Sequence, residues 1–482
     1  MHRTTCRISR RYSRVAAARA IQSAFRKRRK SESLSEYFTP AERPSAAPVR
    51  STTASKLRNF TQKVQAKRIA RFMRQVDPHK RRAAFLKGVC SDAGVCIAFG
   101  KDTRTIKKHF DGFVNFAYLK GSAKQIGNVS KNGFIKLLTY ERNGYVANAI
   151  LKSSTTSSAD NLYYEYLVGQ YINRKSLQFP CFVETYGAFQ YKTNEAYNLM
   201  KRVPMTAIQT LVSGLESVRT QSFQTACQQS NLCAVLIQHI KEAPTLFDKI
   251  KKSPTFAAND LAYILFQIYM PLAYMRHEFT HYDLHSNNVL VYKPVNGAYI
   301  QYHYHMEGDN VVSFKSAYLA KIIDYGRCYF DDAENKGVTG NSKRIYEEVC
   351  QEKACKDCGI IYGFSWLKPL STKNPGNYIC SQITNISHDL RLLTCLPASL
   401  RRTNPSLYAI LQQVVYKLEY GTPALESSGL SANKIHNVMD ACLALQRHMV
   451  GNVEKNEADY QGKPKLGDMH VYWDGTPIRY DN

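Results

Sequence analysis

This 482-residue chain contains the segment His281-Tyr282-Asp283-Leu284-His285-Ser286-Asn287-Asn288-Val289-Leu290-Val291, which gives the clearest indication of its fold. A polar loop runs directly into an apolar strand, so the Asp283 carboxylate and the Asn288 amide are expected at one strand end. A second apolar run, Lys321-Ile322-Ile323-Asp324-Tyr325-Gly326, ends with another carboxylate before a glycine. Carboxylate and carbonyl oxygens are the ligands that Mg²⁺ prefers. The three side chains therefore indicate a metal-dependent site where two strands end.

Transfer of a phosphoryl group from a nucleotide requires Mg²⁺ on the phosphates and a base at the incoming hydroxyl, with little covalent chemistry from the protein. One loop aspartate, one loop asparagine and one later aspartate supply that set. The arrangement resembles the protein-kinase loop His-x-Asp-Leu-x-x-x-Asn and the Asp-Phe-Gly motif, with Tyr325 in place of the phenylalanine. A polar turn could match one motif by chance, but two motifs in the right order favour the kinase-like fold.

The resemblance implies an α+β, bilobal fold with a small β-rich lobe and a large helical lobe. We expect a basic, partly disordered arm and linker at 1–82, the small lobe at 83–203, and the large lobe with its C-terminal tail at 204–482. Periodicity predicts strands at 95–100, 133–140 and 145–152. It predicts large-lobe helices at 208–218, 232–250, 261–277, 406–419 and 432–450.

The small lobe carries the expected nucleotide contacts. Lys152 ends an apolar strand, as the phosphate-binding lysine does in the kinase pattern Val-Ala-Ile-Lys. Glu165, in a helix predicted at 161–172, would hold Lys152 in place as the helix glutamate does in kinases. A solvent-exposed glutamate is the alternative for Glu165 alone.

Two further segments match the kinase pattern less closely. Gly127 and Gly133 are one residue farther apart than the outer glycines of Gly-x-Gly-x-x-Gly, and the middle glycine is missing. Their backbone amides would cover phosphates, or the segment is an ordinary hairpin turn. The run 197–200, ending at Met200, fits a strand that leads into an interlobe hinge beside the adenine of ATP.

Carried over residue by residue, the resemblance makes Asp283 the group that orients and deprotonates the acceptor hydroxyl. Asn288 and Asp324 would hold Mg²⁺, and His281 would brace the catalytic loop, which also presents His285.

Two more positions extend the resemblance. Tyr282 replaces the arginine that pairs with an activation-loop phosphate, so we expect constitutive activity. Asp389 is placed where kinases keep a buried aspartate that braces the catalytic loop, although a simple helix-capping acid is an equal alternative locally.

Asp-Leu-His in place of Asp-Leu-Lys, the long insertion at 292–320, Asp-Tyr in place of Asp-Phe and a missing Ala-Pro-Glu all resemble the atypical, haspin-like branch. The block 90–100 also looks like serine/threonine kinases encoded by large nucleocytoplasmic DNA viruses. The expected function is an ATP- and Mg²⁺-dependent serine/threonine protein kinase. Two alternatives stay open: a small-molecule phosphotransferase of the aminoglycoside or choline kinase type, which also uses an Asp-Leu-His-x-x-Asn loop, and a pseudokinase scaffold.

Two other groups of residues, one of histidines and one of cysteines, could bind a metal ion. His281, His285, His303 and His305 could form a metal site, but alternating strand histidines are more often polar, partly exposed positions. Cys350, Cys355 and Cys358 contain one zinc-like Cys-x2-Cys pair, and reduced structural thiols are the alternative because no second close pair follows.

Positive charge is concentrated at the N-terminal end. Residues 1–82 hold 23 Lys or Arg and four acidic residues, a net charge of +19 out of +28. Nucleic acid or another acidic surface is the expected partner of this arm, besides a protein substrate. Residues 20–30 also resemble a degenerate IQ motif, which calmodulin-like proteins bind, and 1–31 resemble a mitochondrial transit peptide.

The expected location is intracellular, in the cytoplasm or nucleus of a host cell or packaged in a virion, and not secreted. The N-terminus lacks the apolar core of a signal peptide, and the 13 cysteines are scattered irregularly, as in reduced proteins. No run reaches the about 18 uninterrupted apolar residues of a spanning helix, so membrane insertion is not expected.

Overall fold

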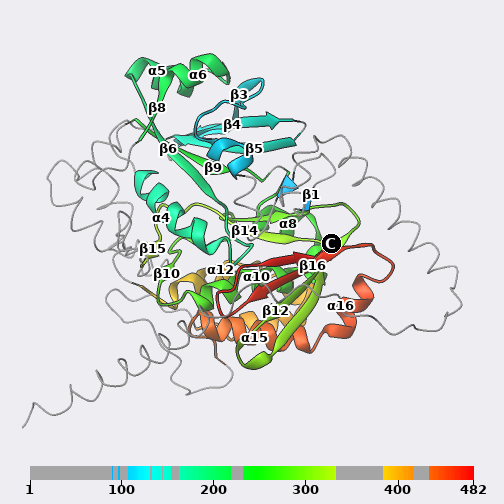
Figure 1. Ribbon diagram of the computed structural model, residues 1–482. Helices are drawn as coiled ribbons and strands as arrows, with labels where there is room; N and C mark the ends of the chain where they lie inside the picture. Colours follow the sequence, from blue (N-terminus) through cyan, green and yellow to red (C-terminus); the bar gives the residue numbers. More distant parts are fainter. Residues whose placement is uncertain are drawn as a thin grey trace, which may run out of the picture. The chain divides into compact units, whose positions relative to one another are not determined.

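A computed structural model describes residues 89–90, 96–97, 107–130, 133–143, 145–153, 162–218, 232–240, 242–332, 384–415 and 434–481. The fold in this part of the chain is mixed α+β, which confirms the predicted class (Figure 1). The basic arm at 1–82 and the cysteine cluster at 350–358 lie outside the described residues. Among the helices that are described, none is both long and apolar enough to cross a membrane.

A seven-stranded antiparallel sheet forms the first part of the fold, in the order β7-β3-β4-β5-β9-β6-β8. Its strands are β3 (Ser122–Ser130), β4 (Gly133–Arg142), β5 (Tyr145–Ser153), β6 (Thr185–Tyr191), β7 (Met205–Ala207), β8 (Leu215–Ser217) and β9 (Cys233–Gln238). Helix α4 (Leu162–Lys175) contacts β6 and β9 on one face. Two short strands, β1 (Val89–Cys90) and β2 (Cys96–Ile97), pair separately.

Alternation along β9 shows how the sheet is buried on both faces. Val235 and Ile237 join the cluster that contains α4, whereas Ala234 and Leu236 join a second cluster on the opposite face. Successive side chains of a strand point to opposite faces, so a continuous apolar run fills both cores. The second cluster is closed by aromatic side chains, including Phe113, beside the short helix η3 (Asp111–Phe113).

Helix α10 (Leu261–Tyr274) is the centre of the second part of the fold. All residues from Leu261 to Ala273 are buried, as expected for a helix that is apolar on every side. Helix α15 (Val438–Val450) packs along it. The remaining helices are α8 (Leu246–Lys252), α9 (Pro254–Asn259), α12 (Arg391–Thr394), α13 (Leu400–Thr403), α14 (Pro405–Leu411), α16 (Val453–Asp459) and the 3-10 turns η5 (Glu307–Asp309) and η7 (His388–Leu390).

The insertion at 292–320 forms a hairpin that joins the C-terminal tail. Strands β12 (Tyr299–His305) and β13 (Val311–Ser316) extend into a four-stranded sheet with β16 (Lys465–Tyr472) and β17 (Arg479–Asp481). The green β12 and the red β16 run side by side in parallel in Figure 1. The buried face of this sheet packs on α10 and α15, and Phe314 of β13 stacks on Tyr263 of α10.

Three predicted elements differ from the structure. The run 197–200 is not a strand, because it lies in helix α5 (Asn194–Arg202), which Thr193 caps by accepting from the Ala196 amide. The segment 232–250 is not one helix, because its first part is strand β9 and only α8 near its end is helical.

The second half of 208–218 is also a strand, since α6 (Ile208–Gly214) gives way to β8. The seven-stranded sheet therefore continues past residue 203, where we expected the small lobe to end.

Candidate active site

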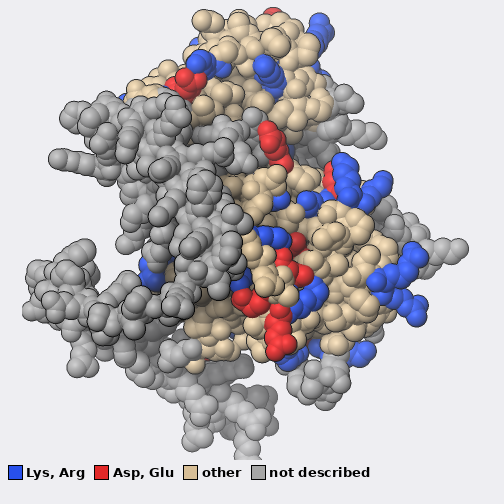
Figure 2. All heavy atoms as spheres, turned by 90° about the vertical axis from the view of Figure 1, so that its right-hand side faces the viewer, with Lys and Arg blue, Asp and Glu red and all other residues tan. Residues whose placement is uncertain are grey.

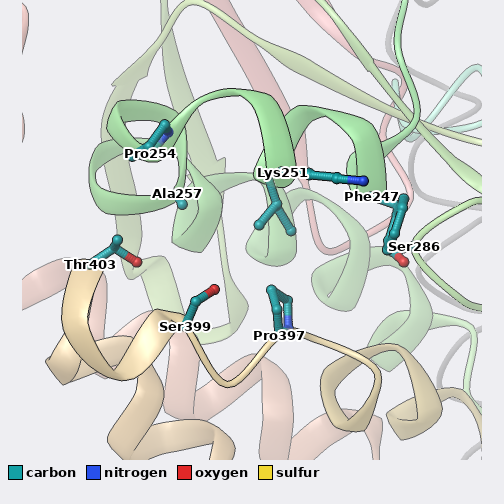
Figure 3. Close-up of a pocket in the computed structure, with 9 residues that line it drawn as sticks. Phe247, Lys251, Pro254, Ala257, Ser286, Pro397, Ser399 and Thr403 are labelled. Atoms are coloured by element: carbon teal, nitrogen blue, oxygen red, sulfur yellow. The ribbon is translucent and has the colours of Figure 1, made fainter.

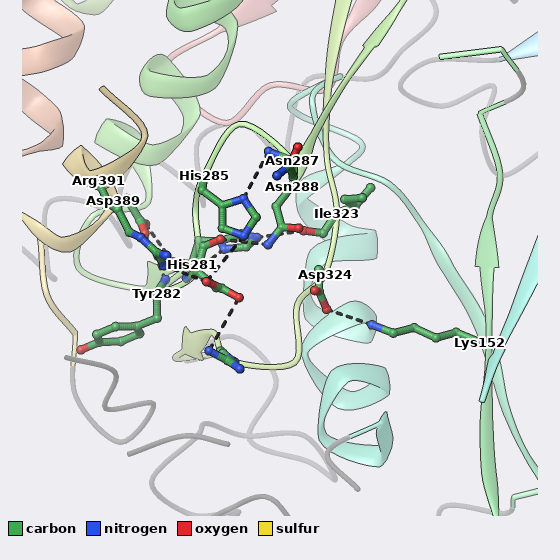
Figure 4. A network of polar contacts seen from close by, with 12 residues as sticks. Lys152, His281, Tyr282, His285, Asn287, Asn288, Ile323, Asp324, Asp389 and Arg391 are labelled. Carbon is green, nitrogen blue, oxygen red and sulfur yellow. Dashed lines mark hydrogen bonds and ion pairs between the residues drawn. The ribbon is translucent and has the colours of Figure 1, made fainter. Parts of the chain in front are cut away.

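Two short ladders bring the two motifs together. Strand β11 (Val289–Tyr292) pairs with β14 (Leu319–Ile322), and β10 (Phe279–Thr280) pairs with β15 (Tyr329–Phe330). The first ladder continues by one bond, in which the Ile323 amide donates to the Asn288 carbonyl at 3.1 Å. Asn288 and Asp324 therefore lie at the same end of one ladder, as Figure 4 shows.

Lys152 links three elements of the site. Its Nζ donates to Glu165 of α4 at 2.7 Å and to Asp324 Oδ1 at 2.8 Å. Lys152 occupies the third strand of the seven-stranded sheet in chain order, opposite Ile135 of β4 and Val235 of β9. A lysine on the third strand, paired with a helix glutamate beside a metal-binding aspartate, is the arrangement that protein kinases use.

Lys152, Glu165 and Asp324 shift one another's pKa values. Burial alone would lower the pKa of Lys152, but the carboxylates of Asp324 and Glu165 outweigh it, so the net pKa is raised. The Lys152 ammonium in turn lowers the pKa of Asp324. Burial raises the pKa of Glu165, against the effect of Lys152. Asp324 is thus held as a carboxylate at neutral pH, the form that binds a metal ion.

Asp389 supports the catalytic loop through two hydrogen bonds to its backbone. Its carboxylate accepts the backbone amides of His281 at 2.8 Å and Tyr282 at 3.0 Å. Burial raises the pKa of Asp389 to about 7, although these two donors act to lower it. Asp389 also lies at the start of η7, but its side chain faces the loop instead of capping that turn.

His281 connects the catalytic loop to the second motif. Its Nε2 lies 3.0 Å from the Ile323 carbonyl, which can only accept, so Nε2 carries the proton. Its Nδ1 then accepts the Asp283 amide at 3.3 Å. Burial lowers the pKa of His281, so the ring stays neutral in this role.

Asp283 lies beside two arginines and a histidine. Arg391 donates to Asp283 Oδ1 at 2.8 Å, while Arg327 approaches Oδ2 and His285 approaches Oδ1, each at 3.8 Å. Burial lowers the pKa of His285, although Asp283 opposes this. No local sequence motif marks Arg391, which lies 108 residues away in sequence.

Two motif residues have a strained backbone. Tyr282 and Asp324 adopt φ values of +62° and +70°, a region that side chains other than glycine rarely occupy. Such strain is concentrated at functional sites, where the surrounding contacts hold it. The Tyr282 ring is fully buried against His388, with ring centroids 4.7 Å apart.

Tyr325 shows what replaces the phenylalanine of the usual motif. Its ring is buried, and its hydroxyl accepts the Val183 amide at 2.9 Å. The same hydroxyl lies 2.8 Å from the Ile322 carbonyl and 3.0 Å from the Val183 carbonyl. The extra oxygen therefore ties the second motif to the segment that precedes β6.

The two predicted glycines lie close to the strand that pairs with β5, whereas the predicted hinge residue lies elsewhere. Gly127 and Gly133, with φ values of +66° and +136°, lie at the β3–β4 hairpin, where the pairing register is interrupted. Gly133 lies on β4, two residues before Ile135, which pairs with Lys152 of β5. Met200 is not at the site, because it is buried in α5 within the second core cluster. The strand beside Lys152 that leads into helix α8 is β9, which is the better candidate for the hinge strand.

The residues present suit a magnesium ion. Asn288 donates through Nδ2 to the Asp283 carbonyl at 2.9 Å, which fixes the amide and leaves Oδ1 as an available acceptor. Asp324 uses Oδ1 for Lys152 and keeps Oδ2. Mg²⁺ is commonly held by one or two protein oxygens together with substrate phosphates and water. An all-protein metal group of three or more His, Cys, Asp or Glu is not found in the described ranges.

The alternative four-histidine site is not formed. His303 contacts Asp468 at 3.0 Å and His305 contacts His470 at 3.0 Å, so both belong to the β12–β16 sheet. His281 and His285 remain in the catalytic loop. The cysteine hypothesis concerns residues outside the described part of the chain.

Comparison with known proteins adds little to this geometry. No family model matches the chain, and no curated protein matches it. Among 455 matching chains of solved structures is a crystal structure of a kinase domain from Plasmodium. It is 15% identical, with a TM-score of 0.24, and the match covers 44% of this chain and 52% of the Plasmodium chain. This similarity is too low to assign the chain to a family.

Proposed function

We propose that this protein is an ATP- and Mg²⁺-dependent phosphotransferase, of the serine/threonine protein kinase type. The observation that carries the proposal is Lys152, whose ammonium bridges Glu165 at 2.7 Å and Asp324 at 2.8 Å. In the kinase mechanism the lysine must pair with the helix glutamate while the aspartate holds the metal. Asp324 lies 172 residues from Lys152 in sequence, and the two side chains meet beside Glu165.

Each residue of the site has its own role in the proposed phosphoryl transfer. Lys152 would keep Glu165 and exchange its contact with Asp324 for the nucleotide phosphates. Asn288 Oδ1 and Asp324 Oδ2 would hold Mg²⁺, which neutralises charge on the phosphates. Asp283 would orient the acceptor hydroxyl and take its proton as the new oxygen–phosphorus bond forms and the bond to the ADP oxygen breaks.

The loop must keep its shape during this transfer. Asp389 fixes the backbone of His281 and Tyr282, and His281 fixes Asp283 relative to Ile323. Such fixed geometry lowers the cost of orienting the reacting groups. Tyr282 occupies the place of the phosphate-pairing arginine with a buried ring, which supports the expectation of constitutive activity.

The direct test is transfer of labelled phosphate from ATP, with Mg²⁺, to a mixed protein panel. Wild-type protein should label serine or threonine, and Asp283→Asn should not. Lys152→Met should also lose transfer, and Glu165→Gln should lose less because an amide oxygen can still accept from lysine. Glu454→Ala, an exposed change in α16, serves as the control and should match wild type.

The alternatives give distinct results in the same assay. Transfer to an amino sugar or choline, with none to proteins, would assign the small-molecule class that shares the Asp-Leu-His loop. Nucleotide binding without any transfer would assign a pseudokinase scaffold, which the missing middle glycine motivates. The haspin-like branch and a viral origin remain part of the proposal, supported by the sequence motifs.

A further inference from the structure

A cavity of about 400 Å³ lies beside the catalytic loop. Figure 3 shows its two walls, with Pro254 and Ala257 on one side and Pro397, Ser399 and Thr403 on the other. Helices α8 and α9 form the first wall, and the segment leading into α13 forms the second.

Both walls are tied to the residues around Asp283. On the first wall, the Phe247 amide donates to the Ser286 carbonyl at 3.1 Å, and Ser286 itself lines the cavity. On the second wall, the segment at Pro397 follows α12, whose first residue, Arg391, donates to Asp283 at 2.8 Å. Two independent contacts therefore hold the cavity at a fixed place relative to the proposed acceptor site.

The distance to Asp283 is short. Ser286 lies three residues beyond Asp283, and three extended residues span at most roughly 11 Å. A polypeptide whose hydroxyl lies at Asp283 would thus reach the cavity within a few residues.

The lining selects for an apolar occupant. Five of the nine lining residues are apolar: Phe247, Ile250, Pro254, Ala257 and Pro397. The polar groups are three hydroxyls and the Lys251 ammonium, and the described lining residues include no carboxylate that could receive a basic side chain. Phe247 is 48% exposed, so part of its ring is open to contact with a bound side chain.

We propose that this cavity binds one large apolar side chain of the protein substrate, within about five residues of the phosphorylated hydroxyl. The inference rests on the proposed kinase function and adds a substrate class to it. Burying such a side chain in an apolar site stabilises the bound substrate by enough to raise kcat/KM roughly tenfold.

The test uses short peptides with one serine in an alanine-rich background. A single phenylalanine is moved through the five positions on either side of the serine, and kcat/KM is measured with the full-length protein. We expect a rise of roughly tenfold at one or two adjacent positions, compared with the peptide that lacks phenylalanine. Ser399→Trp, which fills the cavity from an exposed position, should abolish that preference.

Ala398→Trp is the matched control, since Ala398 is exposed, adjacent to Ser399 and outside the lining, and it should keep the preference. Thermal melting of both variants shows whether they are folded, and Phe247→Ala gives a second route to the same loss. Equal phosphorylation of all peptides, or a preference that survives in both Ser399→Trp and Phe247→Ala, would overturn the inference alone. No transfer to any peptide or protein would overturn the proposed function and this inference with it.

Discussion

At the scale of single residues, Asp283 is held by a cation before any substrate arrives. Arg391 donates to its Oδ1 at 2.8 Å, and both side chains are 16% exposed. A charge-assisted hydrogen bond of this kind fixes the direction of the carboxylate as well as its charge. Oδ2 lies 3.8 Å from Arg327, beyond hydrogen-bond distance, and is the oxygen left to meet an acceptor hydroxyl. Arg391 is therefore a positioning residue in this account.

Replacing Arg391 tests that role. Arg391→Gln should lower kcat by about tenfold, equivalent to about 1.4 kcal/mol of activation free energy, with little change in KM for ATP. Arg391→Lys should recover part of the loss because it restores the charge without the planar guanidinium. Steady-state kinetics with varied ATP separates kcat from KM. A large rise in KM for ATP with unchanged kcat would mean that Arg391 serves nucleotide binding instead.

Sequence could reveal the motif residues because their chemistry is local. Asp283 and Asn288 lie in one loop, and Asp324 ends one strand, so short spacings identify them. Arg391 has no such signal, because a contact across 108 residues depends on how α12 packs. The prediction for Met200 is wrong for the opposite reason. The run 197–200 is locally plausible as a strand, but it forms part of a capped helix.

At the scale of elements, β14 carries a buried charge next to the second motif. Lys321 is 4% exposed, and its Nζ donates to the Phe182 carbonyl at 3.1 Å. Burial lowers its pKa to about 8 from 10.5. The unfolded chain therefore binds more protons than the folded chain between about pH 8 and 10.5, so this group makes stability rise with pH across that range.

The variant Lys321→Met should remove this dependence. The free energy of unfolding of wild type, relative to Lys321→Met, should increase by up to roughly 3 kcal/mol from about pH 8 to about pH 10.5. Denaturant titrations at several pH values measure it. The exposed Lys434→Met provides the control and should follow wild type throughout. A wild-type curve parallel to Lys321→Met across this range would contradict the buried charge.

Elements with a clear hydrophobic periodicity could be predicted from the sequence. For short apolar runs, the sequence does not distinguish a helix from a strand. Strands β4 and β5 and helix α10 were predicted from alternation or from a long apolar run. The run 233–237 is apolar at every position, which suits a buried helix or a doubly buried strand equally. Only the pairing with β5 and β6 distinguishes them, and pairing is a property of the folded chain.

At the scale of the whole molecule, charge is distributed unevenly along the chain. Residues 1–82 carry +19, which leaves +9 for the remaining 400 residues. On the face shown in Figure 2, basic and acidic side chains of the described residues are interspersed. We therefore propose that binding to nucleic acid or another acidic surface depends on the N-terminal arm.

Salt dependence tests this proposal. If the arm neutralises several phosphates, affinity for DNA or RNA should fall by on the order of 10³-fold between about 50 and 200 mM salt, with little dependence on sequence. Deleting 1–82 should remove this binding and leave peptide phosphorylation nearly unchanged, since every proposed catalytic residue lies beyond 150. Unaltered nucleic-acid affinity after deletion would place the binding surface elsewhere.

We propose that Lys152, Asn288 and Asp324 form a site for Mg²⁺ and nucleotide phosphates, and this proposal can be tested by mutation. Its most direct test is the rate of Mg²⁺- and ATP-dependent phosphotransfer by Asp324→Ala, compared with wild type at equal folded fraction. Transfer should be lost while the protein stays folded, because the Asp324 side chain is 42% exposed and Glu165 still pairs with Lys152. Transfer at the wild-type rate by correctly folded Asp324→Ala protein would contradict the claim.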